Sequence, residues 1–157
     1  MHPHAALIER FYQGFQRHDS EAMAACYHPD ITFSDPVFQT LRGDRARTMW
    51  RMLVGRSTDL TLIYRDIVAD DARGTAYWEA TYTFSQTGRK VMNKVHSEFQ
   101  FQDNTIYIQH DTFDLWRWAG MALGPRGSLL GWTPFVQGAI RRQAASGLDA
   151  FIRKQNA

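Results

Sequence analysis

The sequence predicts an α+β fold in which helices pack on one face of a curved antiparallel sheet, with an extra helix at the C-terminus. Apolar residues recur at helical spacing before residue 55 and after residue 135, and they alternate with a period of two between residues 59 and 116. The chain has 157 residues, of which 44% are hydrophobic, and this is enough for one packed core. We therefore expect helices first, then a strand meander, and finally a closing helix.

The first two helices are predicted from an apolar stripe and from capping residues. The stripe of the first helix consists of Leu7, Ile8, Phe11, Tyr12 and Phe15. Asp19 or Ser20 is suited to cap a short second helix that extends to Tyr27. A short strand over 31–33 should follow and break at Asp35-Pro36, because proline interrupts a strand.

A third helix and the strand meander follow the turn at Gly43-Asp44. The helix is predicted from the spacing of Met49, Trp50, Leu53 and Val54. Period-two alternation then predicts strands over 59–69, 76–84, 90–102 and 105–116. The short polar segments between them, such as Thr87-Gly88, are typical of tight turns, so the strands should form an antiparallel meander.

The C-terminal part is predicted to be irregular at first and helical at its end. Glycines at 120, 124, 127 and 131 indicate an irregular connection, and an apolar stripe from Val136 to Ile152 predicts the last helix. Trp116, Trp118 and Trp132 are expected to cover either an opening of the domain or an edge between subunits. We expect one domain over 1–157.

The bulk composition excludes several classes of function. Lys and Arg total 18 against 16 Asp and Glu, so we expect neither a nucleic-acid nor a membrane partner. The lone Cys26 excludes an intrachain disulfide and a cysteine-rich metal site, and the histidine spacings suggest no metal ligand set. The sequence has no signal-peptide pattern and no apolar run of about 20 residues, so a cytoplasmic protein is expected. We also expect no cofactor.

The aromatic content is high for a chain of this length. There are 10 Phe, 6 Tyr and 5 Trp, which together make up 13% of the residues. Side chains of this size form either a bulky core or the wall of a cavity. Composition by itself does not choose between the two.

Two stretches of the chain resemble the nuclear transport factor 2-like superfamily, in particular its SnoaL-like and ketosteroid isomerase-like members. One is Tyr27-His28-Pro29-Asp30-Ile31-Thr32-Phe33-Ser34-Asp35-Pro36 with Gly43 after it, and the other is the strand from Ile106 to Asp114. The resemblance extends from Leu7 to Trp118. It implies a cone-shaped, cystatin-like fold with a deep apolar pocket, a small hydrophobic ligand, and a homodimer formed through the outer sheet face. The SnoaL-like core would then cover about 5–118, with a helical extension over about 119–157.

The resemblance points to Asp35 and Asp111 as candidate catalytic residues. Asp35 matches the aspartate that moves a proton in ketosteroid isomerases, which are a standard case of pKa tuning by burial. Asp111 matches an acid/base aspartate of polyketide cyclases. Strand parity turns Asp111 inward if Gln109 and Phe113 face the pocket, whereas a one-residue slip would turn His110 inward instead. The alternative for Asp35 is a turn in which its carboxylate caps backbone amides.

The sequence also departs from the relatives that it resembles. Ungapped alignment places Phe11 and Ser97 where ketosteroid isomerases have hydrogen-bond donors, and Val95 and Ser97 where epoxide hydrolases have an arginine and an aspartate. Neither catalytic set is complete. Cyclase-type chemistry needs only one acid/base group and a pocket of fitting shape, so the sequence contradicts it least of the three. His96 and His110 are expected on the outer face of the sheet.

A substrate-binding set is predicted around the two aspartates from strand and helix parity. It consists of Phe11, Phe15, Trp50, Trp78, Tyr82, Ser97, Phe99, Gln109 and Phe113. We expect Trp50, Trp78, Tyr82 and Phe113 to line a cavity and most other aromatic residues to form the core. Three functions are compatible with this pattern: a cofactor-free isomerase, cyclase or dehydratase; a binding module for an apolar metabolite; and a protein-interaction domain.

Overall fold

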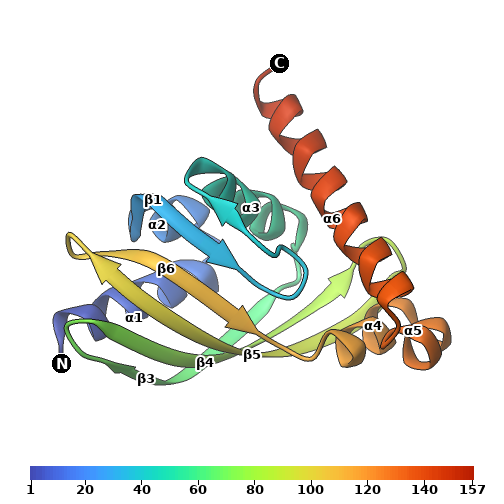
Figure 1. Ribbon diagram of the computed structural model, residues 1–157, viewed down its shortest axis with the longest axis horizontal. Coiled ribbons are helices and arrows are strands. Elements are labelled where there is room, and N and C mark those ends of the chain that lie inside the picture. Colours follow the sequence, from blue (N-terminus) through green and yellow to red (C-terminus); the bar gives the residue numbers. More distant parts are fainter.

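The computed structural model describes all 157 residues as six helices and one six-stranded sheet. The helices are α1 (Pro3–Gln16), α2 (Ser20–Ala25), α3 (Asp44–Arg56), α4 (Leu115–Leu123), α5 (Pro125–Leu130) and α6 (Pro134–Gln155). The strands are β1 (Tyr27–Ser34), β2 (Leu41–Arg42), β3 (Thr61–Ala69), β4 (Arg73–Phe84), β5 (Arg89–Gln102) and β6 (Thr105–Thr112). Figure 1 shows a strongly curved sheet with α1 to α3 gathered on one side of it. The predicted α+β class is confirmed.

The sheet has the strand order β2-β1-β6-β5-β4-β3. The strands β3 to β6 form the expected antiparallel meander. The pairings of β1 were not predicted. This strand lies parallel to β6 on one side and pairs with β2 in an antiparallel hairpin on the other. The structure therefore has a mixed sheet, and the pairing brings the loop after β1 to the C-terminal end of β6.

The core lies between the concave face of the sheet and helices α1 to α3. Its largest fully buried side chains include Phe11, Tyr12, Phe33 and Phe99. Opposite faces of each strand differ as period-two alternation requires: on β5, Val95, Ser97 and Phe99 are buried while the residues between them are exposed. Ser97 is in register with Asp111 on β6, so both side chains turn toward the concave face.

Two predicted element boundaries were wrong. Tyr27 begins β1 and does not belong to the second helix. The last strand ends at Thr112 and not at 116, because Asp114 caps α4 by accepting a hydrogen bond from the Arg117 amide at 3.0 Å.

The glycine-rich connection is also helical, which corrects the prediction of an irregular segment. It forms α4 and α5, which pack closely against each other. A side chain at Gly127 would collide with the Ala119 carbonyl, so this glycine allows the two short helices to approach. Glycine here marks a close helix contact and not an interruption of secondary structure.

Helix α6 crosses the open end of the curved sheet and then extends away from it (Figure 1). Leu148 is fully buried and joins α6 to the core. Arg141 donates to the Pro36 carbonyl at 2.9 Å, and Asp149 pairs with Arg45 of α3 at 3.1 Å. No helix in the structure is long and apolar enough to cross a bilayer.

Candidate functional site

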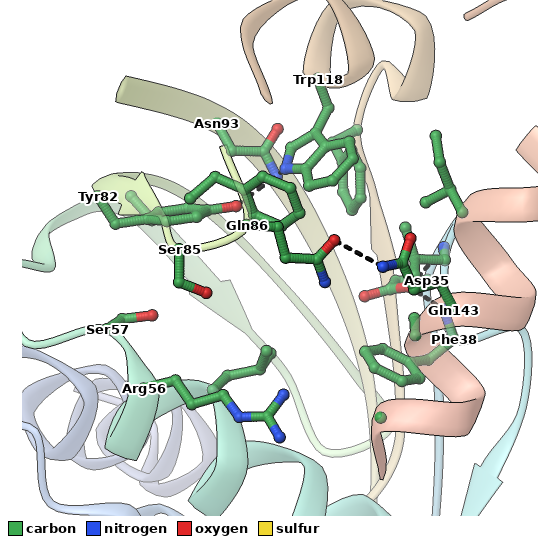
Figure 2. A pocket seen from close by; sticks show the side chains of 18 of the residues that line it. Asp35, Phe38, Arg56, Ser57, Tyr82, Ser85, Gln86, Asn93, Trp118 and Gln143 are labelled. Carbon is green, nitrogen blue, oxygen red and sulfur yellow. Dashed lines mark hydrogen bonds between the residues drawn. The ribbon is translucent and has the colours of Figure 1, made fainter. Parts of the chain in front are cut away.

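A cavity of about 360 Å³ lies between the sheet, α3 and α6. Its wall is mostly apolar, with 19 hydrophobic residues among the 29 that line it. The loop after β1 contributes Asp35, β6 contributes Asp111, and α6 contributes a stripe that includes Ile140 and Gln143. Figure 2 shows Asp35, Tyr82, Asn93 and Gln143 around this space. A cavity of this size and composition is suited to a small apolar ligand.

Asp111 is the most deeply buried ionisable group in the cavity wall, with 2% of its surface exposed. Its Oδ1 atom accepts hydrogen bonds from Ser97 Oγ at 2.5 Å and from Gln109 Nε2 at 3.1 Å. No group of the protein donates to Oδ2, and this atom is not sealed from the cavity. One oxygen of Asp111 is therefore held by the protein and the other is available to a ligand.

Ser97 connects Asp111 to two further donors from the core. Its Oγ atom accepts hydrogen bonds from the Tyr12 hydroxyl at 2.8 Å and from Trp78 Nε1 at 2.9 Å. An indole N–H can only donate, so the Ser97 hydroxyl hydrogen is left to point at Asp111. Tyr12 and Ser97 are both fully buried, which fixes this chain of hydrogen bonds.

A second chain of hydrogen bonds reaches the same oxygen through Gln109. Trp50 Nε1 donates to the Tyr27 hydroxyl at 2.8 Å, and Tyr27 donates to Gln109 Oε1 at 2.6 Å. Because Trp50 can only donate, Tyr27 must give its hydrogen to Gln109, and the Gln109 amide nitrogen then faces Asp111. We refer to Tyr12, Tyr27, Trp50, Trp78, Ser97, Gln109 and Asp111 as the Asp111 network.

The direction of these hydrogen bonds decides where Asp111 carries its proton. Both chains end in a donor to Oδ1, so the two lone pairs of this oxygen already accept hydrogen bonds and are not available to a proton. The proton of the neutral acid therefore lies on Oδ2, where it faces the cavity. This arrangement presents either an O–H donor or a carboxylate oxygen to a bound molecule.

Burial raises the pKa of Asp111 to about 7, although its hydrogen bonds from Ser97 and Gln109 act in the opposite direction. The nearby charge of Asp35 raises this pKa further. The pKa values of Tyr12 and Tyr27 also lie well above the ordinary value, mainly because of burial and secondly because of Asp111. Both phenols therefore remain protonated donors, while Asp111 changes charge near neutral pH.

Asp35 is placed at the cavity by a turn that it stabilises itself. Its Oδ1 atom accepts from the backbone amides of Val37 at 2.7 Å and Phe38 at 2.6 Å. Its Oδ2 atom has no hydrogen bond within the protein. Burial raises the pKa of Asp35 to about 6, against the effect of the two amides. The structure thus combines the turn and the pocket, which were alternatives from sequence.

The structure divides the predicted substrate-binding set into two groups. Five of its aromatic members line the cavity together with the two aspartates: Phe15, Trp50, Trp78, Tyr82 and Phe113. Four members do not line it and lie in the core behind the wall: Phe11, Ser97, Phe99 and Gln109. Ser97 and Gln109 reach the cavity wall through their hydrogen bonds to Asp111, and Phe11 and Phe99 pack the helix against the sheet. The role of the predicted set in binding a substrate stays a prediction.

Three further features of the site were not predicted. Tyr12, and not Phe11, reaches Ser97, although the ungapped alignment had pointed to Phe11. Trp118 lines the cavity and donates to the Tyr82 hydroxyl at 2.9 Å, which leaves the Tyr82 hydrogen free for a ligand. Helix α6 supplies a whole side of the wall, because its 136–147 stripe faces inward.

The outer face of the sheet carries the two histidines considered from sequence. His96 and His110 are exposed there, and His110 shares a 2.6 Å hydrogen bond with Ser34. Asp111 and not His110 faces the concave side, so the slipped register that was considered as an alternative is excluded. Trp116 and Trp132 are about half exposed and lie outside the cavity wall.

Comparison with known proteins identifies a family and a fold. Residues 8–108 match the model of the SnoaL-like domain family. No curated protein matches the sequence significantly.

Solved structures share the fold at low sequence identity. A candidate SnoaL-like polyketide cyclase from a Jannaschia species superposes with a TM-score of 0.69 at 11% identity, covering 78% of this chain and 93% of that one. A candidate polyketide cyclase from Xanthomonas campestris gives 0.63 at 21%, covering 76% and 96%. An LEH-like epoxide hydrolase from M. tuberculosis gives 0.62 at 20%, covering 83% and 97%. These superpositions show the fold, and sequence identities this low do not identify a reaction.

Proposed function

The chain belongs to the SnoaL-like domain family, and on this basis we propose that it is a cofactor-free enzyme that moves protons on a small hydrophobic substrate. One observation carries the proposal: Asp111 has one oxygen held by two converging chains of hydrogen bonds and the other turned to an apolar cavity. A buried carboxyl group that served structure alone would be expected to have hydrogen bonds at both oxygens. A fixed, cavity-facing oxygen on a group with a pKa near 7 is suited to general acid/base chemistry.

The two aspartates divide the work between them. Asp35, whose pKa is the lower of the two, is the carboxylate that takes a proton from a carbon next to a carbonyl group. Asp111 donates its Oδ2 proton to the carbonyl oxygen, so that a neutral enol forms. Asp35 then gives its proton to a different carbon of the enol, and Asp111 takes back the proton of the enol hydroxyl, so that both aspartates regain their starting states and a rearranged product is released. Isomerisation, ring closure and elimination of water all begin with this enolisation.

Tyr82 is placed to support the same step. Its hydroxyl accepts from Trp118, so its own hydrogen points away from the indole and toward the cavity. This side chain supplies a second donor for an enolate-like oxygen, in place of the ketosteroid isomerase donors at the positions of Phe11 and Ser97.

Two expectations from the sequence, a homodimer through the outer sheet face and a cytoplasmic location, stay predictions.

Proton exchange into carbon acids tests the proposed function without knowledge of the natural substrate. The purified protein is incubated in D₂O with a panel of neutral aromatic β-keto esters and β,γ-unsaturated ketones, and loss of the relevant C–H signal is followed by NMR. We expect exchange that is faster than with buffer alone and that saturates with substrate concentration. If panel members bind but none exchanges, the chain is a binding module for apolar metabolites, which was the second hypothesis.

Asn93 offers a prediction about stability. Its amide is half buried on the inner face of β5 and lines the cavity, yet it makes no hydrogen bond within the protein (Figure 2). We expect Asn93→Leu to raise the free energy of unfolding by about 1 kcal/mol, because it removes an unpaired amide and buries apolar surface. Urea denaturation measures this change.

The matched control for Asn93 is Gln109, an amide on the inner face of the neighbouring strand β6. Gln109 is fully buried and bonded at both ends of its amide, so Gln109→Leu is expected to lower stability by about 2 kcal/mol. Destabilisation by Asn93→Leu of the same size would show that Asn93 is a structural residue and not a ligand-facing one.

A further inference from the structure

One end of the cavity carries polar side chains that make no hydrogen bond or ion pair within the protein. Arg56 and Ser57 come from the end of α3, and Ser85 comes from the turn between β4 and β5; we call these three residues the mouth group. The two segments are held side by side because Asp59 accepts hydrogen bonds from the backbone amide and hydroxyl of Thr83. Figure 2 shows the mouth group on the opposite side of the cavity from Asp35.

Arg56 is the only positively charged residue in the cavity wall. It makes no hydrogen bond and no ion pair within the protein, whereas Arg45, Arg47 and Arg51 of the same helix all pair with acidic side chains. Its guanidinium group lies 6.0 Å from the ring centroid of Phe151 and close to Gly147 of α6. The hydroxyl groups of Ser57 and Ser85 also have no partner within the protein. Three donor groups without a hydrogen-bond acceptor in the protein therefore surround one end of an apolar cavity.

The charges of the cavity are arranged along its length. Both acidic groups of the wall, Asp35 and Asp111, lie away from the mouth group, because Asp111 is in register with Ala76 near the start of β4 while Ser85 follows the end of that strand. An anionic group on a ligand is repelled by the Asp35 carboxylate and attracted by Arg56. An amphipathic anion is therefore favoured in the orientation that places its charged end at the mouth group.

From this arrangement we propose that the substrate is an elongated, apolar carboxylate whose carboxylate group binds to Arg56, Ser57 and Ser85. A planar guanidinium group matches a carboxylate with two parallel hydrogen bonds, and the serine hydroxyls supply further donors. The apolar body of the substrate then extends toward Asp35 and Asp111. This inference rests on the proposed function, because the carboxylate site would serve to orient the reacting carbon toward the two aspartates.

A pair of fluorescent probes that differ in one group tests the mouth group. Anthracene-2-carboxylate is an elongated aromatic anion at neutral pH, and anthracene-2-methanol is its neutral counterpart. We expect the wild-type protein to bind the carboxylate about 5-fold more tightly than the alcohol, and added salt to reduce this preference. Arg56→Gln should abolish the preference and leave the affinity for the alcohol within about 2-fold.

Two control variants separate charge at the site from charge elsewhere. Arg56→Lys keeps the positive charge and should retain part of the preference for the carboxylate. Arg142→Gln removes an exposed arginine of α6 that does not line the cavity, and it should change neither affinity. A role of Arg56 at the end of α3 alone would alter the unfolding free energy and leave the ratio of the two affinities unchanged.

The outcomes for the mouth group and for the proposed function are distinguishable. If the alcohol binds and neutral keto esters exchange, but the carboxylate is not preferred or Arg56→Gln retains the preference, the carboxylate site is wrong and the enzyme proposal stands. If neither probe binds the wild-type protein, the cavity does not accept apolar ligands and both proposals are overturned.

Discussion

Asp111→Asn is expected to lower the rate of proton exchange by about 10²- to 10⁴-fold, the range found when a general acid/base is removed. Asparagine has the shape of aspartate, and its Oδ1 atom can still accept from Ser97 and Gln109. An amide nitrogen then replaces Oδ2, and this group can neither accept a proton nor release one at neutral pH. The affinity for anthracene-2-methanol should stay within about 3-fold, because the shape of the cavity is retained.

The same assay separates the two aspartates from other acidic residues. Asp35→Asn should reduce exchange by a similar factor, since it removes the proposed base, and it should also lower the pKa of Asp111 by removing a nearby negative charge. Asp30→Asn, at an exposed position outside the cavity wall, is the matched control and should have full activity. Undiminished exchange in Asp111→Asn would remove Asp111 from the mechanism.

The stability of the protein is expected to fall as the pH rises from about 4 to about 7. The pKa of Asp111 is about 7 in the folded state, compared with 3.8 for an ordinary aspartate, so the folded state binds the proton more tightly than the unfolded chain. The stabilisation is complete below the unfolded pKa and is lost as the pH passes through the folded pKa. This difference between the folded and unfolded pKa of Asp111 corresponds to about 4 kcal/mol of unfolding free energy.

Asp111→Asn isolates this contribution. Urea denaturation of the wild-type protein and the variant between pH 4.5 and 8.5 gives two stability curves, and all other groups cancel in their difference. We expect the wild-type protein to lose about 3 kcal/mol more stability than the variant over this range, and the variant to retain only the smaller decline due to Asp35. Parallel curves would mean that Asp111 is not buried as a neutral acid.

Strand periodicity predicted the most important part of the site. Because side chains alternate along a strand, the pattern of β6 reduced the possibilities to Asp111 inward or His110 inward, and the register of β6 with β5 selects Asp111. The same rule placed Trp78 and Tyr82 on the inner face of β4, where both line the cavity. Local patterns of this kind depend on the backbone alone, so they are readable from one sequence.

Features that depend on contacts between distant segments were not predictable in this way. Tyr12 and Phe11 both lie on the buried side of α1, and only the rotation of the helix against the sheet decides that Tyr12 reaches Ser97. Helix α6 has an apolar stripe that fits a core as well as a cavity wall. The glycines around Gly127 indicate a turn or a close helix contact equally well until the partner at Ala119 is known.

NMR can follow the protonation of Asp111, a buried acid whose cavity-facing oxygen gains and loses a proton near neutral pH. The ¹³Cγ chemical shift of Asp111 is followed from pH 3 to 9 in protein labelled with [¹³C]aspartate, with Asp111→Asn used to assign the signal. We predict a midpoint at a pH of about 7 for Asp111, and one of about 6 for Asp35. A midpoint near 3.8, the ordinary value of an aspartate, would show that Asp111 is not protonated in the cavity near neutral pH.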